Sequence, residues 1–253
     1  MMDGVEAGFF LTALYQKKHA ATYSPSGIIH GSFLQYFNCK LRLEASKFEM
    51  TKNQRQALVK FLKFIGFPEP THSLSRQELF QRISGPLFAA GPEIPGSLGR
   101  FSISFSRSSA DLEHFDLFKR YQMVVHSEAE DTITFERFFR FLQKSPLPPD
   151  GNFGTWHADY CIDNVLFATS IFDLWPNGLS SAYCFYDPEM RYLSPGIVSC
   201  LIEIALTAYL GQINILGNQY YHLGYYLESC QKLRYKACFG PYQIFDQKAQ
   251  EWR

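Results

Sequence analysis

The chain has 253 residues, and its 24 basic and 24 acidic side chains leave a formal net charge of zero at pH 7, so it lacks the strongly basic composition of many nucleic-acid-binding domains. Aromatic residues make up 17% of the sequence, which excludes general intrinsic disorder. No apolar run reaches the roughly 20 residues of a membrane helix and no signal-peptide pattern opens the chain, so we expect a cytoplasmic protein, with the nucleus as a second location and no membrane partner.

Residues 51–65 predict the first helix. Thr51 and Gln54 have the spacing of a capping box, and apolar residues recur at helical spacing until Gly66 and Pro68 interrupt the pattern. Basic residues crowd this region and predict either a solvated helix face or a surface for phosphates. They are Lys40, Arg42, Lys47, Lys52, Arg55, Lys60 and Lys63.

A shorter helix and a connection follow. Ser75 and Glu78 repeat the capping spacing before a helix that we expect to end near Gly85. Residues 84–100 are rich in glycine and proline, which predicts a surface connection without chemistry.

Two more helices are predicted at residues 112–125 and 134–143, each with one apolar face. Prolines and glycine at 146–151 then break the chain and mark a candidate boundary before a strand-rich part.

Three consecutive strands are predicted at residues 155–162, 165–174 and 180–186. The dipeptides Asp163-Asn164 and Asn177-Gly178 are typical of hairpins, so neighbouring strands should pair antiparallel.

Ser194 and Pro195 predict the start of a buried helix, and residues 220–227 return as another strand. This order outlines an α/β (α+β) fold with an acetyltransferase-like (GNAT-type) core and a mixed, largely antiparallel sheet. A divergent second GNAT-like half in the first part of the chain is an open alternative. We expect residues 1–110 to form a divergent amino-terminal region with a basic helix and a variable linker, and residues 111–253 to form the catalytic region.

Six stretches carry a resemblance to a known family. They are DLFKRYQMVVH (116–126), FERFFRFLQKSPL (135–147), GTWHADYCIDNVLFATSIFDLWP (154–176), LSSAYCFYDPE (179–189), LSPGIVSCLIEIALTAYL (193–210) and YYHLGYYLESCQKLRYK (220–236). In this order and spacing they resemble the arginyltransferases, which move arginine from Arg-tRNA onto protein amino termini. The resemblance implies Arg-tRNA and acceptors beginning with Asp, Glu or oxidised Cys as partners, and a role in the N-degron pathway of protein degradation.

An aminoacyl ester is already activated, so such a site must hold the acceptor amine against the carbonyl, remove a proton and shelter the oxyanion. A carboxylate has to hold the donor guanidinium. Asp173 and Asp187 match acidic positions of the family, although Asp187 before Pro188 also suits a turn. Glu203, within the buried helix, is expected to be a structural partner.

Further roles follow from the resemblance, each with a structural alternative. Lys119 and Arg120 would read the acceptor's acidic group, with Tyr121 and Gln122 orienting the peptide, or would form an exposed helix face. Three residues are additional catalytic candidates, as a proton relay or as hydrogen-bond donors to the carbonyl, or else as packing and hairpin residues: His157, Ser180 and Ser181.

The last candidates surround the returning strand. The expected substrate contacts are Tyr186, Tyr225, Tyr226 and Ser229, and the expected tRNA contacts are Lys52, Arg55, Lys232, Arg234, Tyr235 and Lys236. Alternating tyrosines are also typical of a half-buried strand.

Two rival functions remain open. One is a non-catalytic protein that binds tRNA or N-degrons on the same fold. The other is a CoA-dependent N-acetyltransferase, which is disfavoured because Pro188 and Pro195 remove backbone amides from the loop that would hold a pyrophosphate.

The amino terminus departs from the family. Its members usually carry a CxxC pair and a later Cys-Cys pair that hold an iron-sulfur cluster or another metal, whereas only Cys39 lies near the corresponding positions here. We therefore expect no metal and no cofactor besides the co-substrate Arg-tRNA. The six cysteines, at positions 39, 161, 184, 200, 230 and 238, are expected to be single thiols.

Overall fold

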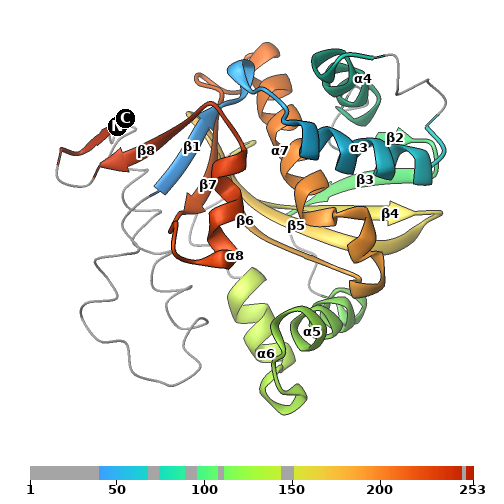
Figure 1. Ribbon diagram of the computed structural model, residues 1–253. Coiled ribbons are helices and arrows are strands. Elements are labelled where there is room, and N and C mark those ends of the chain that lie inside the picture. Colours follow the sequence, from blue (N-terminus) through green and yellow to red (C-terminus); the bar gives the residue numbers. More distant parts are fainter. Residues whose placement is uncertain (1–39, 68–73, 89–95, 108–110, 144–150, 247–248) are drawn as a thin grey trace.

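The computed structural model describes residues 40–67, 74–88, 96–107, 111–143, 151–246 and 249–253 (Figure 1). Within them, nine strands form one sheet in the order β2-β3-β4-β5-β6-β7-β1-β8-β9. Every neighbouring pair of these strands is antiparallel except β6 and β7. The predicted α/β class with a mixed, largely antiparallel sheet is confirmed.

The three central strands are those that the sequence predicts. They are β4 (Gly154–Ile162), β5 (Val165–Trp175) and β6 (Gly178–Tyr186), and they pair as two consecutive hairpins. Asp163 and Asn164, in the first turn, have φ values of 51° and 65°. Two consecutive left-handed residues give a turn whose twist matches that of the strands, which explains the Asp-Asn signal.

The buried helix is α7 (Pro195–Gln212), which packs on one face of the sheet beside the helices α3 (Lys52–Phe64) and α4 (Arg76–Phe88) (Figure 1). It is 18 residues long with a mean hydropathy of 1.3, so by length and composition alone it could cross a membrane. Most of it is buried inside the fold, as in a core helix.

After α7 the chain returns as β7 (Tyr220–Tyr225), which runs parallel to β6 over Gly178–Ser180. Gly178 has a φ of 152°, and a Cβ atom at this position would lie 2.1 Å from the carbonyl oxygen of Tyr220. Only glycine permits both the backbone conformation and this close approach of the two strands.

Strands from the early part of the chain extend both ends of the sheet. On one side β1 (Lys40–Glu44) lies between β7 and β8 (Tyr242–Asp246), followed by β9 (Glu251–Trp252). On the other side β2 (Gly96–Leu98) and β3 (Phe101–Ser106) pair beside β4. Segments before and after residue 110 thus share one sheet and one hydrophobic core, while the functional division at 110 stays a prediction.

The two predicted helix starts are confirmed. In α3 the Gln54 amide donates to Thr51 Oγ1 over 3.3 Å and the Thr51 amide donates to Gln54 Oε1 over 2.8 Å. Ser75 and Glu78 make the same reciprocal pair before α4.

The predicted end of α4 near Gly85 is wrong, and so is the interpretation of the described parts of 84–100 as a surface connection, whereas residues 89–95 lie outside the described residues. The helix continues to Phe88, since Leu87 and Phe88 are buried in the core. Beyond it, β2 joins the sheet, and a Cβ atom on Gly96 would lie 2.0 Å from the Leu87 carbonyl oxygen. Tight packing, and not turn formation, requires this glycine.

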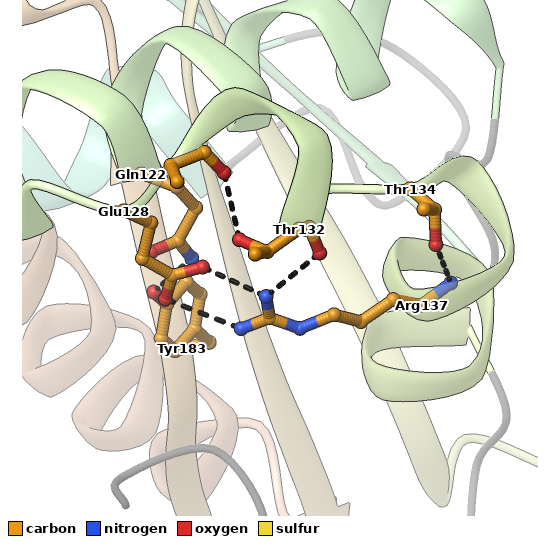
Figure 2. Close-up of polar contacts among 7 residues, drawn as sticks. Gln122, Glu128, Thr132, Thr134, Arg137 and Tyr183 are labelled. Carbon is orange, nitrogen blue, oxygen red and sulfur yellow. Dashed lines mark hydrogen bonds and ion pairs between the residues drawn. The ribbon is translucent and has the colours of Figure 1, made fainter. Parts of the chain in front are cut away.

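The opposite face of the sheet is partly covered by α5 (Leu112–His126), α6 (Phe135–Phe138) and the π-helical turn η3 (Phe139–Gln143) (Figure 1). Phe118, Phe138 and Phe185 are fully buried in this second core. Arg137 holds α6 against the end of α5 by donating to Glu128 over 2.8 Å and to the Thr132 carbonyl oxygen over 3.1 Å (Figure 2).

Candidate active site

A row of polar residues crosses six neighbouring strands on the face of the sheet opposite α7. Directly opposed residues of paired strands share a face, and each member of this row is paired with the next. We call this set the polar row, and it runs Thr155 (β4), Asp173 (β5), Ser180 (β6), His222 (β7), Arg42 (β1) and Gln243 (β8).

Asp173 marks the acidic end of the polar row. Its side chain is only 5% exposed, and Thr155 Oγ1 donates to its carboxylate over 2.5 Å. A carboxylate at this depth in a sheet is costly unless it is hydrogen-bonded or has a charged partner. Asp173, the predicted partner of the donor guanidinium, thus lies in the same row as Ser180, which is also a predicted site residue.

Aromatic rings surround the middle of the row. His222 lies 5.0 Å from the Trp175 ring and 5.4 Å from the Trp252 ring, measured between centroids. Burial and the nearby charges of Arg42 and Lys40 lower the pKa of His222 to about 3. The imidazole is therefore neutral at physiological pH.

Arg42 forms the basic end. Its guanidinium carbon lies 3.8 Å from the centroid of the Tyr220 ring and 4.1 Å from that of Trp252, so the guanidinium is held between two aromatic rings. Its Nε donates to Gln243 Oε1 over 2.9 Å. We refer to Trp175, Tyr220 and Trp252 as the aromatic cage.

On the α7 face, Glu203 is the expected structural partner, and the contacts confirm its burial and pairing. Its carboxylate is 1% exposed and accepts from the hydroxyls of Tyr221, over 2.7 Å, and Ser170. Burial raises the pKa of Glu203, and its hydroxyl partners, Ser181 among them, counteract this only in part. Ser180 and Ser181 thus belong to opposite faces and do not act together.

Asp187 lies away from the polar row. It is the N-cap of the 3-10 helix η4 (Pro188–Leu193), where it accepts from the Glu189 amide over 3.0 Å, and it forms a 3.0 Å ion pair with Arg120. Asp173 and Asp187 lie near opposite ends of the β5–β6 hairpin, roughly 20 Å apart at the strand rise per residue. One guanidinium pocket cannot contain both.

The predicted acceptor residues on α5 are engaged within the fold. Lys119 Nζ lies 2.8 Å from Glu130 Oε1, in addition to the Arg120–Asp187 pair. Tyr121 packs against Tyr186 with ring centroids 4.9 Å apart. Gln122 Nε2 donates to the Tyr183 hydroxyl over 2.7 Å (Figure 2).

The two basic segments predicted to contact tRNA meet at one cleft of about 650 Å³. Thr51 and Asn53 line it from the start of α3, and Tyr235 and Cys238 line it from the 3-10 helix η5 (Tyr235–Cys238). The side chains of Lys52 and Arg234 are exposed, as is that of Tyr235. Arg55, also in α3, donates to the Leu74 carbonyl oxygen over 3.2 Å.

Lys236 is turned inward. Its Nζ donates to the Tyr225 carbonyl oxygen over 2.9 Å, and burial lowers its pKa to about 8. The structure does not describe the Lys232 side chain. Among the other predicted residues, Tyr225 and Tyr226 are half-buried, Ser229 is exposed and His157 is 1% exposed on β4.

No three His, Cys, Asp or Glu side chains gather into a metal-binding group among the residues that the structure describes. Cys39, near the expected metal-binding region, lies outside those residues. The described cysteines, Cys161, Cys184, Cys200, Cys230 and Cys238, are free thiols, and burial raises the pKa of Cys184 and of Cys200 to about 12. Buried thiols of this kind are unreactive.

The family model described as "Arginine-tRNA-protein transferase, C terminus" matches residues 113–246. Arginyl-tRNA--protein transferase 1 of Arabidopsis thaliana is 38% identical over 164 residues, 60% of this chain and 26% of the relative, so the chain spans about a quarter of that protein. The Drosophila melanogaster protein of the same name is 32% identical over 147 residues, 55% of this chain and 30% of the relative.

A bacterial relative, the aspartate/glutamate leucyltransferase of Campylobacter jejuni strain RM1221, is 36% identical over 135 residues, 52% of each chain. Among solved structures, the L-PGS of Bacillus licheniformis is 11% identical with a TM-score of 0.36, covering 77% of this chain and 47% of that one.

Proposed function

The chain belongs to the arginine-tRNA-protein transferase family, and from this premise we propose that it transfers arginine from Arg-tRNA to the amino-terminal α-amine of proteins that begin with Asp, Glu or oxidised Cys. The observation that carries the proposal is the polar row, because it combines a buried carboxylate, a hydroxyl and a caged arginine on one face of the sheet. These groups suit the opposite charges of a donor guanidinium and an acidic acceptor.

The proposed reaction needs positioning more than a strong nucleophile. The acceptor nitrogen bonds to the ester carbonyl carbon, the bond from this carbon to the ribose oxygen breaks, and a proton passes from the amine to the departing oxygen. Asp173 would pair with the donor guanidinium, and the Ser180 hydroxyl, one strand away, would donate to the carbonyl oxygen as negative charge develops there.

We further propose that the core is acetyltransferase-like. The order of three antiparallel strands, a buried helix and a strand parallel to the third supports this, together with β6–β7 pairing that is limited to Gly178–Ser180. The loop before α7 carries Pro188 and Pro195, which argues against a CoA pyrophosphate there.

The tRNA would approach the α3–η5 cleft, where exposed cations and Tyr235 suit phosphates and a terminal base. We also propose that the protein acts in the cytoplasm and without a metal. If so, protein prepared without oxygen should contain no stoichiometric iron or zinc, and transfer should be insensitive to chelators. Tightly bound metal would contradict this part.

The direct test is transfer of labelled arginine to peptides that differ only in their first residue. We expect product with Asp- and Glu-initiated peptides and none with Ala-initiated peptides. Parallel reactions with labelled Leu-tRNA separate arginine transfer from the activity named for the bacterial relative. Binding of tRNA without product in any reaction would favour the non-catalytic alternative.

A further inference from the structure

Arg42 combines three features of an anion-binding arginine. Its planar guanidinium is stacked between Tyr220 and Trp252, which fixes its plane. Its Nε is occupied by the Gln243 amide oxygen, which is uncharged. Among the residues that the structure describes, the two terminal nitrogens of Arg42 have no hydrogen-bond partner, and no carboxylate lies within ion-pair distance.

Four of the other described arginines are neutralised by carboxylates. Arg100, Arg120, Arg137 and Arg253 each pair with an aspartate or glutamate. Arg42 is instead accompanied by a second cation, Lys40, on the same face of β1, and burial lowers the pKa of Lys40 to about 8. His222, whose pKa is about 3, is neutral and leaves the charge of Arg42 unchanged.

We propose that Arg42, held between Tyr220 and Trp252 and assisted by Lys40, binds the side-chain carboxylate of the acceptor's first residue. This inference rests on the proposed arginine transfer and assigns acceptor selection to β1 in place of α5. The fixed plane of Arg42 would present its terminal nitrogens to both carboxylate oxygens, which is the geometry that makes arginine selective for planar anions.

The length of the polar row fits the two substrates together. Asp173 and Arg42 are three strand spacings apart, or roughly 14 Å at the usual distance between strands. In an extended arginyl-aspartate or arginyl-glutamate unit, the guanidinium carbon and the acidic carboxyl carbon are roughly 12–14 Å apart by standard bond lengths. With the guanidinium at Asp173 and the carboxylate at Arg42, the new peptide bond would form between them, beside Ser180 and His222.

A carboxylate suits the site better than a tRNA phosphate does. Arg42 lies on the face of the sheet opposite α7, whereas the exposed cations Lys52, in α3, and Arg234, directly before η5, lie on the α7 side. The aromatic rings cover the faces of the half-buried Arg42 guanidinium, so that only the edge with its two terminal nitrogens can contact a ligand. Such an edge favours a single small anion over a continuous phosphate backbone.

The test is a binding titration without tRNA, which uses the intrinsic fluorescence of the cage tryptophans. Peptides beginning with Asp and with Asn differ in charge at nearly constant shape. We expect the wild-type chain to bind the Asp peptide more tightly than the Asn peptide. Arg42→Gln should lower the affinity for the Asp peptide by about 10- to 100-fold, as for loss of a charge-assisted pair, and should leave the affinity for the Asn peptide nearly unchanged.

Arg120→Gln is the matched control and should leave the preference for Asp intact. If Arg42→Gln fails to fold, Gln243→Glu keeps Arg42 and places a competing carboxylate beside its Nε, so it should abolish the same preference. Transfer assays with each variant should then show a higher KM for the acceptor peptide and an unchanged affinity for Arg-tRNA.

Equal binding of Asp and Asn peptides by the wild type would overturn the inference even if arginine is transferred. A lower salt dependence of tRNA binding in Arg42→Gln would also overturn it by identifying a phosphate site. Selective binding of the Asp peptide without any arginine transfer would instead contradict the proposed function, and the inference that Arg42 binds a carboxylate would still hold.

Discussion

Buried charged side chains are paired differently on the two faces of the sheet. On the α7 face, Glu203 is enclosed by the hydroxyls of Ser170 and Tyr221 within the apolar core. On the other face, Asp173 and Arg42 occupy one row without pairing to each other, because two strands separate them. The first arrangement completes the fold by itself, whereas the second leaves opposite charges separated, as the proposed binding of both substrates requires. Burial alone therefore does not distinguish a structural carboxylate from a functional one.

Removing the enclosed carboxylate should have the largest effect on stability. We expect Glu203→Ala to lower the free energy of unfolding by roughly 3 kcal/mol, because it leaves a cavity and unpaired buried hydroxyls. Glu203→Gln keeps the volume and an acceptor and should cost less than half as much. Urea unfolding followed by circular dichroism measures both. An Ala variant of unchanged stability but without transfer would place Glu203 in the catalytic machinery.

Neutralising Asp173 should instead act on the reaction. We expect Asp173→Asn to reduce kcat/KM for Arg-tRNA by about 10- to 100-fold, since a charge-assisted hydrogen bond contributes about 1.5–3 kcal/mol. Asp187→Asn is the control: it loses an N-cap and a partly exposed ion pair, so its main effect should be a stability loss of about 1 kcal/mol. If Asp187→Asn reduced kcat/KM for Arg-tRNA and Asp173→Asn only lowered stability, the guanidinium site would be at Asp187.

Most of the framework was predictable because its signals are local. The Asp163-Asn164 turn fixes a hairpin, and the Thr51–Gln54 pair fixes a helix start. The sequence does not predict the extension of α4, because distant core contacts hold Leu87 and Phe88 in the helix and outweigh the turn propensity of the Gly85-Pro86 pair.

The site was only partly predictable for the same reason. Asp173 and Ser180 were found because they lie within the family motifs, but their separation from Asp187 depends on the direction of the β5–β6 hairpin. In the sequence, Arg42 is only one of a run of basic residues. Its neighbours in the fold, Tyr220 and Trp252, are at least 178 positions away in sequence, and only sheet order brings them together.

We expect the stability of α5, which covers part of the second face, to depend on pH. His114, near the start of α5, contacts Asp111 over 2.6 Å and Asp159 over 3.0 Å. Burial by itself lowers the pKa of His114, but the hydrogen bonds and charges of Asp159 and Asp111 outweigh it and raise the pKa to about 9. The unfolded value is 6.5, so this stabilisation is complete below pH 6.5 and is lost as pH rises through 9.

Thermal unfolding between pH 6 and 10 measures this effect. We expect the pH-dependent part of the stability difference between the wild type and His114→Gln to be at most about 3 kcal/mol at pH 6 and to be lost near pH 10, where His114 is neutral. The comparison with the variant is needed because burial lowers the pKa values of Lys40 and Lys236 to about 8. These two lysines make the stability rise with pH over the range in which His114 makes it fall, and they do so equally in both proteins. A difference that does not vary with pH would mean that His114 is neutral in the fold.

The smallest effects are expected at the α3–η5 cleft, where exposed cations act mainly through long-range attraction. Lys52→Gln and Arg234→Gln should each reduce the slope of log affinity for tRNA against log salt by about one unit for each phosphate that the side chain neutralises, because fewer counterions are released. Filter binding at several salt concentrations measures the slope. Arg42→Gln should leave it unchanged, since that residue lies on the other face. A slope that falls with Arg42 and not with Lys52 or Arg234 would reverse the assignment of the two faces, placing the nucleic acid over the aromatic cage and the acceptor peptide at the cleft.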